Sequence, residues 1–229
     1  MTIHYHGTPI TPMSAFYALA GRHFCVSFYR PDQVRQAHAV GQSVLIDNGA
    51  FSAYTAGRPV GNWSAYYDFC DVWLDHPTTW AVVPDIIDAG AAAQDELLKA
   101  WPHGRRGAPV WHTDEPIARL VDLTQEWPRV CIGSAGRFWQ VLSPEWCGRI
   151  DAAFEALDKV HKRWPWIHML RGMQLAANGR WPFASVDSTD VARNHKSRGG
   201  KPLAMASRWD SAQCGAVWTK PSAKQAQLF

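Results

Sequence analysis

Residues 43–52 read Ser-Val-Leu-Ile-Asp-Asn-Gly-Ala-Phe-Ser, so a short apolar run changes abruptly into polar and small residues. The apolar part, residues 44–46, is aliphatic and largely β-branched, which is typical of a strand buried on both faces. Asp47, Asn48 and Gly49 follow at once, and these residue types favour a turn. The stretch therefore predicts a buried strand that ends in a polar turn carrying a carboxylate.

The same pattern recurs along the chain, where short apolar runs alternate with longer amphipathic stretches. Strands are expected at residues 24–28, 44–46, 80–83, 109–111, 130–132, 167–170, 183–186 and 203–206. Helices are expected at residues 31–40, 63–74, 89–101, 114–127 and 143–160. About eight strands alternating with helices predict an α/β fold, specifically a compact (β/α)8 TIM-like barrel. A doubly wound open sheet is the alternative.

The bulk composition fits a globular protein, with 47% apolar and 19% charged residues in a chain of 229. We expect a single barrel domain over residues 1–219 and a polar tail over residues 220–229. The five cysteines are odd in number and form no CxxC pair, which argues against a disulfide framework or a cysteine-rich zinc site. The sequence has no evident leader and no apolar run long enough to span a membrane, so a cytoplasmic location is expected.

Polar or small residues stand directly after several of the expected strands. They are Asp47, Asp85, His112, Gly133 with Ser134, and Asp187. In barrels the carboxyl ends of the strands carry the functional groups, so we expect these residues to share one site. An aspartate at such a position can also serve only to cap the following helix.

Four segments together resemble the tRNA-guanine transglycosylase superfamily and cover roughly residues 43–194. They are LIDNGAFS (45–52), VVPDI (82–86), CIGSAG (131–136) and FASVDSTD (183–190). The resemblance is greatest to the phage and bacterial DNA-modifying branch, which inserts 7-deazaguanines into DNA. It implies that guanine in DNA is exchanged for a free 7-deazaguanine base such as preQ0, without a cofactor or metal. For a phage-encoded chain, the location would be the cytoplasm of the bacterial host.

The resemblance implies a covalent mechanism with two carboxylates. Asp187 would attack C1′ of the nucleotide and expel guanine, forming a glycosyl-aspartate intermediate. Asp47 would be the general base that takes the ring proton of the incoming deazaguanine, and it could first protonate the departing guanine.

The resemblance also implies which residues would bind the base. Asp85 would accept hydrogen bonds from the guanine-like N1–H and exocyclic amine, with Asp88 as the competing candidate. His112 stands where the family tends to carry Gln. The remaining predicted substrate-binding residues are Asn48 at the base edge, Phe51 stacked on the base, and Gly133 and Ser134 in the turn that approaches it.

A basic stretch follows the proposed nucleophile, because no carboxylate occurs between Asp190 and Asp210. The cations predicted to hold DNA phosphates after the target base leaves the stack are Arg193, Lys196, Arg198, Lys201 and, from the glycine turn, Arg137. A solvated surface loop is the simpler interpretation of this stretch. DNA is preferred to tRNA because only Cys214 lies where the tRNA enzymes carry their Cys/His zinc site. The family also suggests a homodimer.

Three other interpretations remain open. His4 and His6 form an HxH pair that, with His112, His168 and Asp187, is similar to the metal set of amidohydrolase barrels. The same carboxylates would also serve a nucleosidase that hydrolyses free nucleosides. The basic and aromatic residues alone would suffice for a non-catalytic nucleic-acid-binding module.

Overall fold

The structure is a computed structural model that describes residues 1–220, and its core is one parallel sheet. Within this part of the chain the sheet has nine strands, in the order β5-β4-β3-β2-β1-β9-β8-β7-β6. The strands are β1 Ile3–Gly7, β2 His23–Ser27, β3 Ser43–Asp47, β4 Thr79–Val82, β5 Gly107–Ala108, β6 Val110–His112, β7 Arg129–Gly133, β8 Trp166–Met169 and β9 Ser185–Ser188. The predicted polar tail lies outside the described residues except for Lys220.

The two end strands of this sheet are consecutive in the chain, and they close it into a barrel. β5 pairs with β4, β6 pairs with β7, and only Pro109 separates them. Pro109 has no N–H to donate to a ladder, which explains the break at this point, but its carbonyl accepts a 2.8 Å bond from the Cys131 N–H. With β5 and β6 counted as one interrupted strand, this is a nearly closed eight-stranded barrel, so the predicted (β/α)8 fold is confirmed.

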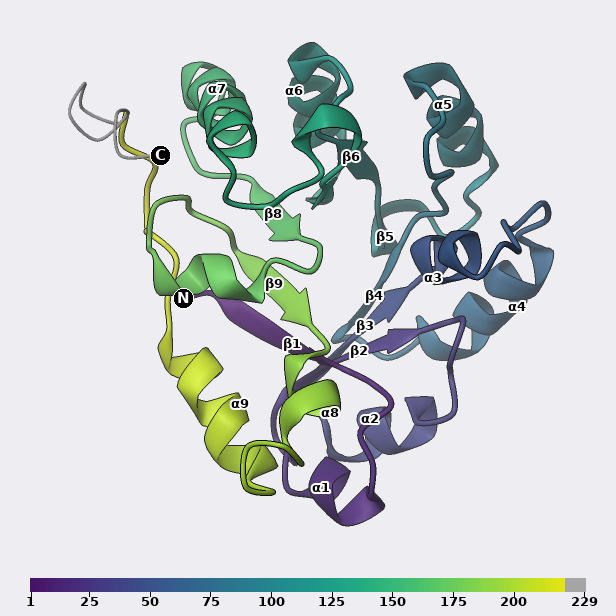
Figure 1. Cartoon of the computed structure of the whole chain (residues 1–229). Coiled ribbons are helices and arrows are strands. Elements are labelled where there is room, and N and C mark those ends of the chain that lie inside the picture. Colours follow the sequence, from purple (N-terminus) through teal and green to yellow (C-terminus); the bar gives the residue numbers. More distant parts are fainter. Residues whose placement is uncertain (221–229) are drawn as a thin grey trace.

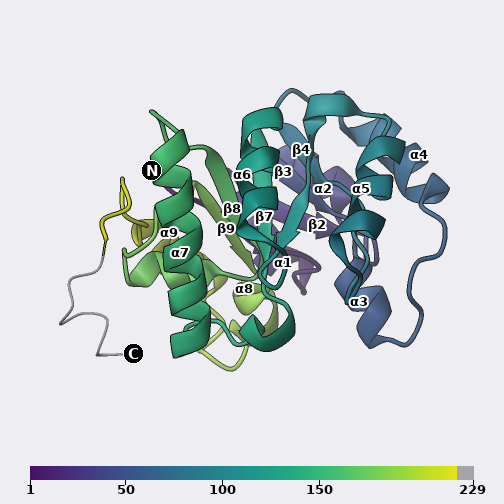
Figure 2. The same ribbon diagram turned by 90° about the horizontal axis from the view of Figure 1, so that it is seen from above.

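Helices surround the strands on the outside of the barrel (Figure 1). They are α1 Met13–Tyr17, α2 Val34–Val40, α3 Ala50–Thr55, α4 Ser64–Trp73, α5 Ala91–Ala100, α6 Ile117–Glu126, α7 Pro144–Val160, α8 Asp190–Asn194 and α9 Pro202–Ser211. Short 3-10 turns occur at Gly104–Arg106, Gly136–Phe138 and Met173–Ala177. α6 and α7 lie side by side in both views (Figures 1 and 2). No helix in residues 1–220 is long and apolar enough to cross a membrane.

One expected strand is wrong. Residues 203–206 belong to α9, because Pro202 occupies its first turn and the following Leu-Ala-Met-Ala run consists of strong helix formers. Met205 and Ala206 pack into the core from that helix. The eighth strand is instead β1, at the amino terminus, which contains the HxH pair His4 and His6 and was not among the expected strands.

The interior of the barrel decides which side chains reach the site. Inward-facing residues form a separate cluster, made of Tyr5, Cys25, Leu45, Trp80, Val82, Ala108, Val110 and Cys131. Side chains alternate between the two faces of a strand, so Asp47 shares the inward face of Leu45. Asp187 is the register partner of inward-facing Tyr5 and shares its face. Both aspartates therefore point into the barrel.

Candidate active site

A cavity of about 1020 Å³ lies at the carboxyl ends of the strands, and it collects residues from most of the loops that leave them. All eight residues predicted to be catalytic or base-binding line it, namely Asp47, Asn48, Phe51, Asp85, His112, Gly133, Ser134 and Asp187. The competing candidate Asp88 also lines it, but is exposed and bound by the Tyr54 hydroxyl at 2.6 Å. The strand-end prediction thus identified groups that are distant in sequence and adjacent in space.

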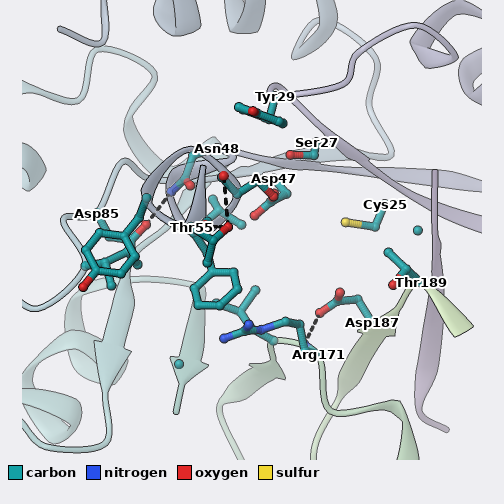
Figure 3. A pocket seen from close by; sticks show the side chains of 18 of the residues that line it. Cys25, Ser27, Tyr29, Asp47, Asn48, Thr55, Asp85, Arg171, Asp187 and Thr189 are labelled. Carbon is teal, nitrogen blue, oxygen red and sulfur yellow. Dashed lines mark hydrogen bonds between the residues drawn. The ribbon is translucent and has the colours of Figure 1, made fainter. Parts of the chain in front are cut away.

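Asp187 is buried at the end of β9 and is held from one side. Its Oδ1 accepts the backbone N–H of Arg171 at 2.7 Å and lies 3.2 Å from Nε2 of His168. Because both contacts end on Oδ1, Oδ2 has no hydrogen bond from the described part of the chain. Figure 3 shows the carboxylate directed into the cavity. This leaves one oxygen available to a substrate atom.

His168 connects Asp187 to a chain of hydrogen bonds inside the barrel. Its ring is fully buried, and Nδ1 lies 2.9 Å from the Ser185 hydroxyl, which also accepts the Trp166 indole N–H at 3.0 Å. Since the indole can only donate, the Ser185 hydroxyl proton is free to point to Nδ1. Because a carboxylate only accepts hydrogen bonds, the N–H at Nε2 donates to Asp187. From the sequence, His168 is predicted only as a possible metal ligand, although its inward position two residues after Trp166 follows from strand alternation.

Asp47 faces the same cavity from the end of β3 (Figure 3). In the sheet, β2 and β1 lie between β3 and β9. Burial raises the pKa of Asp47 to about 6, and the negative charges of Asp187 and Asp85 contribute to the rise. Ser27 and the Gly49 N–H, which is 3.2 Å from Oδ2, oppose it. A carboxyl group with this pKa exchanges protons near neutral pH, as general acid–base catalysis requires.

Asp85 is fixed by two neighbours at the other side of the cavity. Asn48 donates to Oδ1 at 2.8 Å, and His112 Nε2 lies 2.9 Å from Oδ2. Burial alone would lower the pKa of His112, but its hydrogen bond to Asp85 and the charge of Asp85 outweigh burial, so the pKa is raised. His112 Nδ1 is buried and has no hydrogen-bond partner among residues 1–220. Asp85 and His112 therefore form a hydrogen-bonded pair in the lining of the cavity.

The side-chain amide of Asn48 makes most of its hydrogen bonds with other groups of the protein. Its nitrogen donates to Val83 O and to Asp85, and its oxygen accepts the Ala50 N–H at 2.8 Å. The last bond starts α3 directly after the strand. Asn48 therefore positions Asp85, and only a lone pair of its oxygen is left for the predicted contact with a base edge.

Phe51 is partly exposed on α3, and its ring is covered by Arg171, a residue that none of the four sequence segments includes. The Arg171 guanidinium carbon lies 3.8 Å from the centre of the ring. Arg171 has a φ of 54°, a left-handed conformation that is uncommon for arginine. A base can stack on this face of Phe51 only if the guanidinium moves aside.

The glycine turn after β7 packs closely on its neighbours. A Cβ at Gly133 would lie 3.2 Å from the His112 ring and 3.3 Å from Val110, so the glycine preserves the position of His112. The Ser134 hydroxyl accepts the Trp146 indole N–H at 2.9 Å. Both residues thus have structural roles in addition to their places in the lining.

Only one of the five cations predicted to bind phosphate, Arg193, lines the cavity. Lys196, Arg198 and Lys201 are exposed outside the lining, and Arg198 lies 3.7 Å from Asp190. Arg137 packs over Phe138 at 4.6 Å and lines a separate hollow. The structure does not bring these five side chains together.

The HxH pair points away from the site. His4 and His6 alternate with Tyr5, so they lie on the outer face of β1, where His6 Nε2 is 3.1 Å from Asp210. Asp187 faces inward, and the proposed metal set cannot converge. Within residues 1–220, no three His, Cys, Asp or Glu side chains are grouped so that they could hold a metal ion.

Comparisons with known proteins agree with the barrel. No model of a known protein family matches the sequence, and no curated protein matches it. The fold is similar to a mutant tryptophan synthase alpha-subunit from the hyperthermophile Pyrococcus furiosus, with a TM-score of 0.52 and 8% identity over 92% of this chain and 96% of that chain. A second mutant of the same subunit gives a TM-score of 0.48 at 8% identity, over the same shares of the two chains. At this identity the similarity establishes the barrel fold alone.

Proposed function

We propose that the chain is a transglycosylase that exchanges guanine in DNA for a 7-deazaguanine such as preQ0. The supporting observation is that Asp47 and Asp187 line one cavity in different environments. Asp187 has one oxygen bound by two N–H groups and one facing the cavity. Asp47 has its pKa raised to about 6. One carboxylate is thereby suited to attack, and the other to transfer a proton.

The reaction consists of two displacements at the same sugar carbon. Asp187 Oδ2 attacks C1′ as the N9–C1′ bond of guanine breaks, and protonated Asp47 supplies the proton that the leaving base requires. N9 of the deazaguanine then attacks C1′, its ring proton passes to Asp47, and the ester bond to Asp187 breaks. Two inversions retain the configuration of the sugar.

Asp85 is the proposed reader of the base. Its oxygens are fixed by Asn48 and His112, and a fixed carboxylate accepts the adjacent N1–H and amine hydrogens of a guanine-like edge. Fixing the acceptor before binding reduces the ordering cost of recognition. Both guanine and a 7-deazaguanine present this edge, as an exchange enzyme requires.

Base exchange can be measured directly. The protein would be incubated with a DNA oligonucleotide, labelled guanine and preQ0, and the digested nucleosides analysed by mass spectrometry. We expect label or deazaguanosine in DNA with the wild type and with Asp122→Asn, an exposed control on α6 outside the lining, and none with Asp187→Asn. A matched RNA and free deoxyguanosine serve as alternative substrates.

Other outcomes separate the competing functions. Incorporation into RNA alone would replace DNA with RNA as the polymer. Release of guanine from free nucleosides without insertion would indicate a nucleosidase. Nucleic-acid binding that survives in Asp187→Asn, with no chemistry in the wild type, would leave only a binding module.

A further inference from the structure

The exposed aromatic side chains of this protein gather at one place. Within residues 1–220, five Phe, Tyr and Trp side chains are more than a third exposed, and four of them line the mouth of the cavity. These four are Tyr29, Phe51, Tyr54 and Trp139, with Trp139 at 69% exposure. The fifth, Tyr17 on α1, lies outside the lining. Exposed aromatic rings grouped around a functional cavity mark a binding surface.

Three exposed arginines share this rim. Arg30 follows β2, Arg171 follows β8 and Arg193 lies on α8, and all three line the same cavity. Arg30 is only loosely paired, with its Nε 3.6 Å from an oxygen of exposed Asp32. We call these three arginines and the four aromatic residues the aromatic rim.

The carboxylates lie mostly beneath this rim. Asp47, Asp85 and Asp187 are buried or partly buried, whereas Asp88 is exposed and engaged by Tyr54. A ligand would therefore meet aromatic faces and positive charge first and the carboxylates below them. This combination matches a strand of nucleotides, with bases that stack on rings and phosphates that pair with arginines.

The geometry favours unpaired nucleotides over a duplex. The rim residues follow five strands, β2, β3, β7, β8 and β9, and Figure 3 shows Tyr29 and Arg171 on different sides of the cavity. In a duplex the neighbouring bases stack on one another and offer no free face to Tyr29 or Trp139. Extrusion of one nucleotide from a duplex frees only the two base faces that line the gap, whereas in a single strand the flanking bases can turn toward rings on separate sides of the mouth.

We propose that the aromatic rim binds single-stranded DNA, with the nucleotides that flank the target base stacked on Trp139 and Tyr29 and their phosphates held by Arg30, Arg171 and Arg193. This inference rests on the proposed function for the choice of DNA. It assigns the substrate class as single-stranded or locally melted DNA. It also moves polymer recognition from the basic stretch after Arg193 to the mouth of the barrel.

Binding can be measured without any chemistry. Fluorescence anisotropy would give dissociation constants of the full chain for a labelled 12-nucleotide DNA strand, its duplex and the RNA of the same sequence, with no free base added. The test variants are Trp139→Ala and Tyr29→Ala. The matched controls are Tyr17→Ala, the exposed aromatic away from the cavity, and Arg163→Ala, an exposed arginine that precedes β8 at the opposite end of the barrel.

We expect the single DNA strand to bind more tightly than the duplex. Each rim variant should weaken it by at least about fivefold, as the loss of one stacked base predicts, while both controls bind as the wild type does. Equal or tighter binding of the duplex, or rim variants with unchanged affinity, would overturn the proposal. Tighter binding of the RNA would overturn DNA as the occupant. If the rim binds the single strand but no base is exchanged, the binding proposal is supported and the proposed exchange reaction is rejected.

Discussion

His168 Nε2 lies 3.2 Å from Asp187 Oδ1 inside the barrel, and Nδ1 on the other side of the ring lies 2.9 Å from the Ser185 hydroxyl. The histidine therefore orients the carboxylate of Asp187 without reaching the cavity itself, since it is fully buried and absent from the lining. This makes His168 a positioning residue for the proposed nucleophile.

Replacing His168 tests that role. His168→Phe should lower kcat of base exchange by about 100-fold, the scale expected when a reacting group loses its orientation, with KM for the free base little changed. His168→Gln retains a donor of similar reach and should recover part of kcat. If both variants raise KM and leave kcat intact, the histidine does not position Asp187. Circular dichroism would check that both variants fold.

The raised pKa of Asp47 predicts a pH-dependent cost to stability. Because the pKa in the folded protein, about 6, exceeds the ordinary value of 3.8, the folded state holds the proton more tightly. Wild-type stability is therefore lost as pH rises from about 4 through 6. Asp47→Asn should gain about 2 kcal/mol in unfolding free energy relative to wild type between pH 4 and pH 8, by urea denaturation. A constant difference across this range would show that Asp47 is not destabilised by burial.

The same group should set the acidic limb of activity. In the proposed reaction the second displacement requires ionised Asp47 to accept the proton of the incoming base, so its rate at saturating base should fall below about pH 6, whereas release of guanine, which uses protonated Asp47, should slow above that pH. Asp47→Asn should lose this limb together with most of the activity. A wild-type profile that stays flat down to pH 5 would exclude Asp47 as the base.

His4, on the outer face of β1, should give the stability of the protein the opposite dependence on pH. Burial lowers the pKa of His4 to about 4, so the folded state excludes the proton that the unfolded chain binds below about 6.5. Stability should be lost as pH falls from 6.5 to 4, by up to about 3 kcal/mol. His4→Gln should flatten this part of the stability curve, whereas His76→Gln, at an exposed site, should not. Identical curves for the two variants would contradict the assignment.

Gly133→Ala tests the link between the glycine turn and the base reader. The added Cβ would lie 3.2 Å from the His112 ring, so the ring would have to shift by a few tenths of an ångström relative to Asp85. We expect KM for the free base to rise by about tenfold, because such overpacking costs about 1–3 kcal/mol, with kcat less affected. Gly148→Ala on α7, where the added Cβ meets open space, is the control. An unchanged KM would show that the glycine turn does not contribute to recognition of the base.

The sequence predicted structure correctly where the residues of a single strand were sufficient to indicate both the strand and its end. Residues 44–46 and Asp47 gave both a strand and the group at its carboxyl end, and seven of the eight expected strands overlap observed ones. The error at residues 203–206 arose because a four-residue apolar run fits a strand as well as a helix. In α9 it is Pro202 and the packing of Met205 that decide between them. The short helices α1, α3 and α8 were missed because they span at most six residues.

By itself, the sequence determined the barrel and the aspartates at its strand ends, because apolar periodicity and polar termination are local properties of each strand. Only the tertiary structure decided that His168 supports Asp187, that Arg171 covers Phe51, that the HxH pair faces outward, and that the exposed aromatic residues meet around one mouth. These depend on register and on closure of the sheet, which join residues from different strands. A change of one residue in register would turn an inward side chain outward, and the register between two strands cannot be read from the sequence of either strand alone.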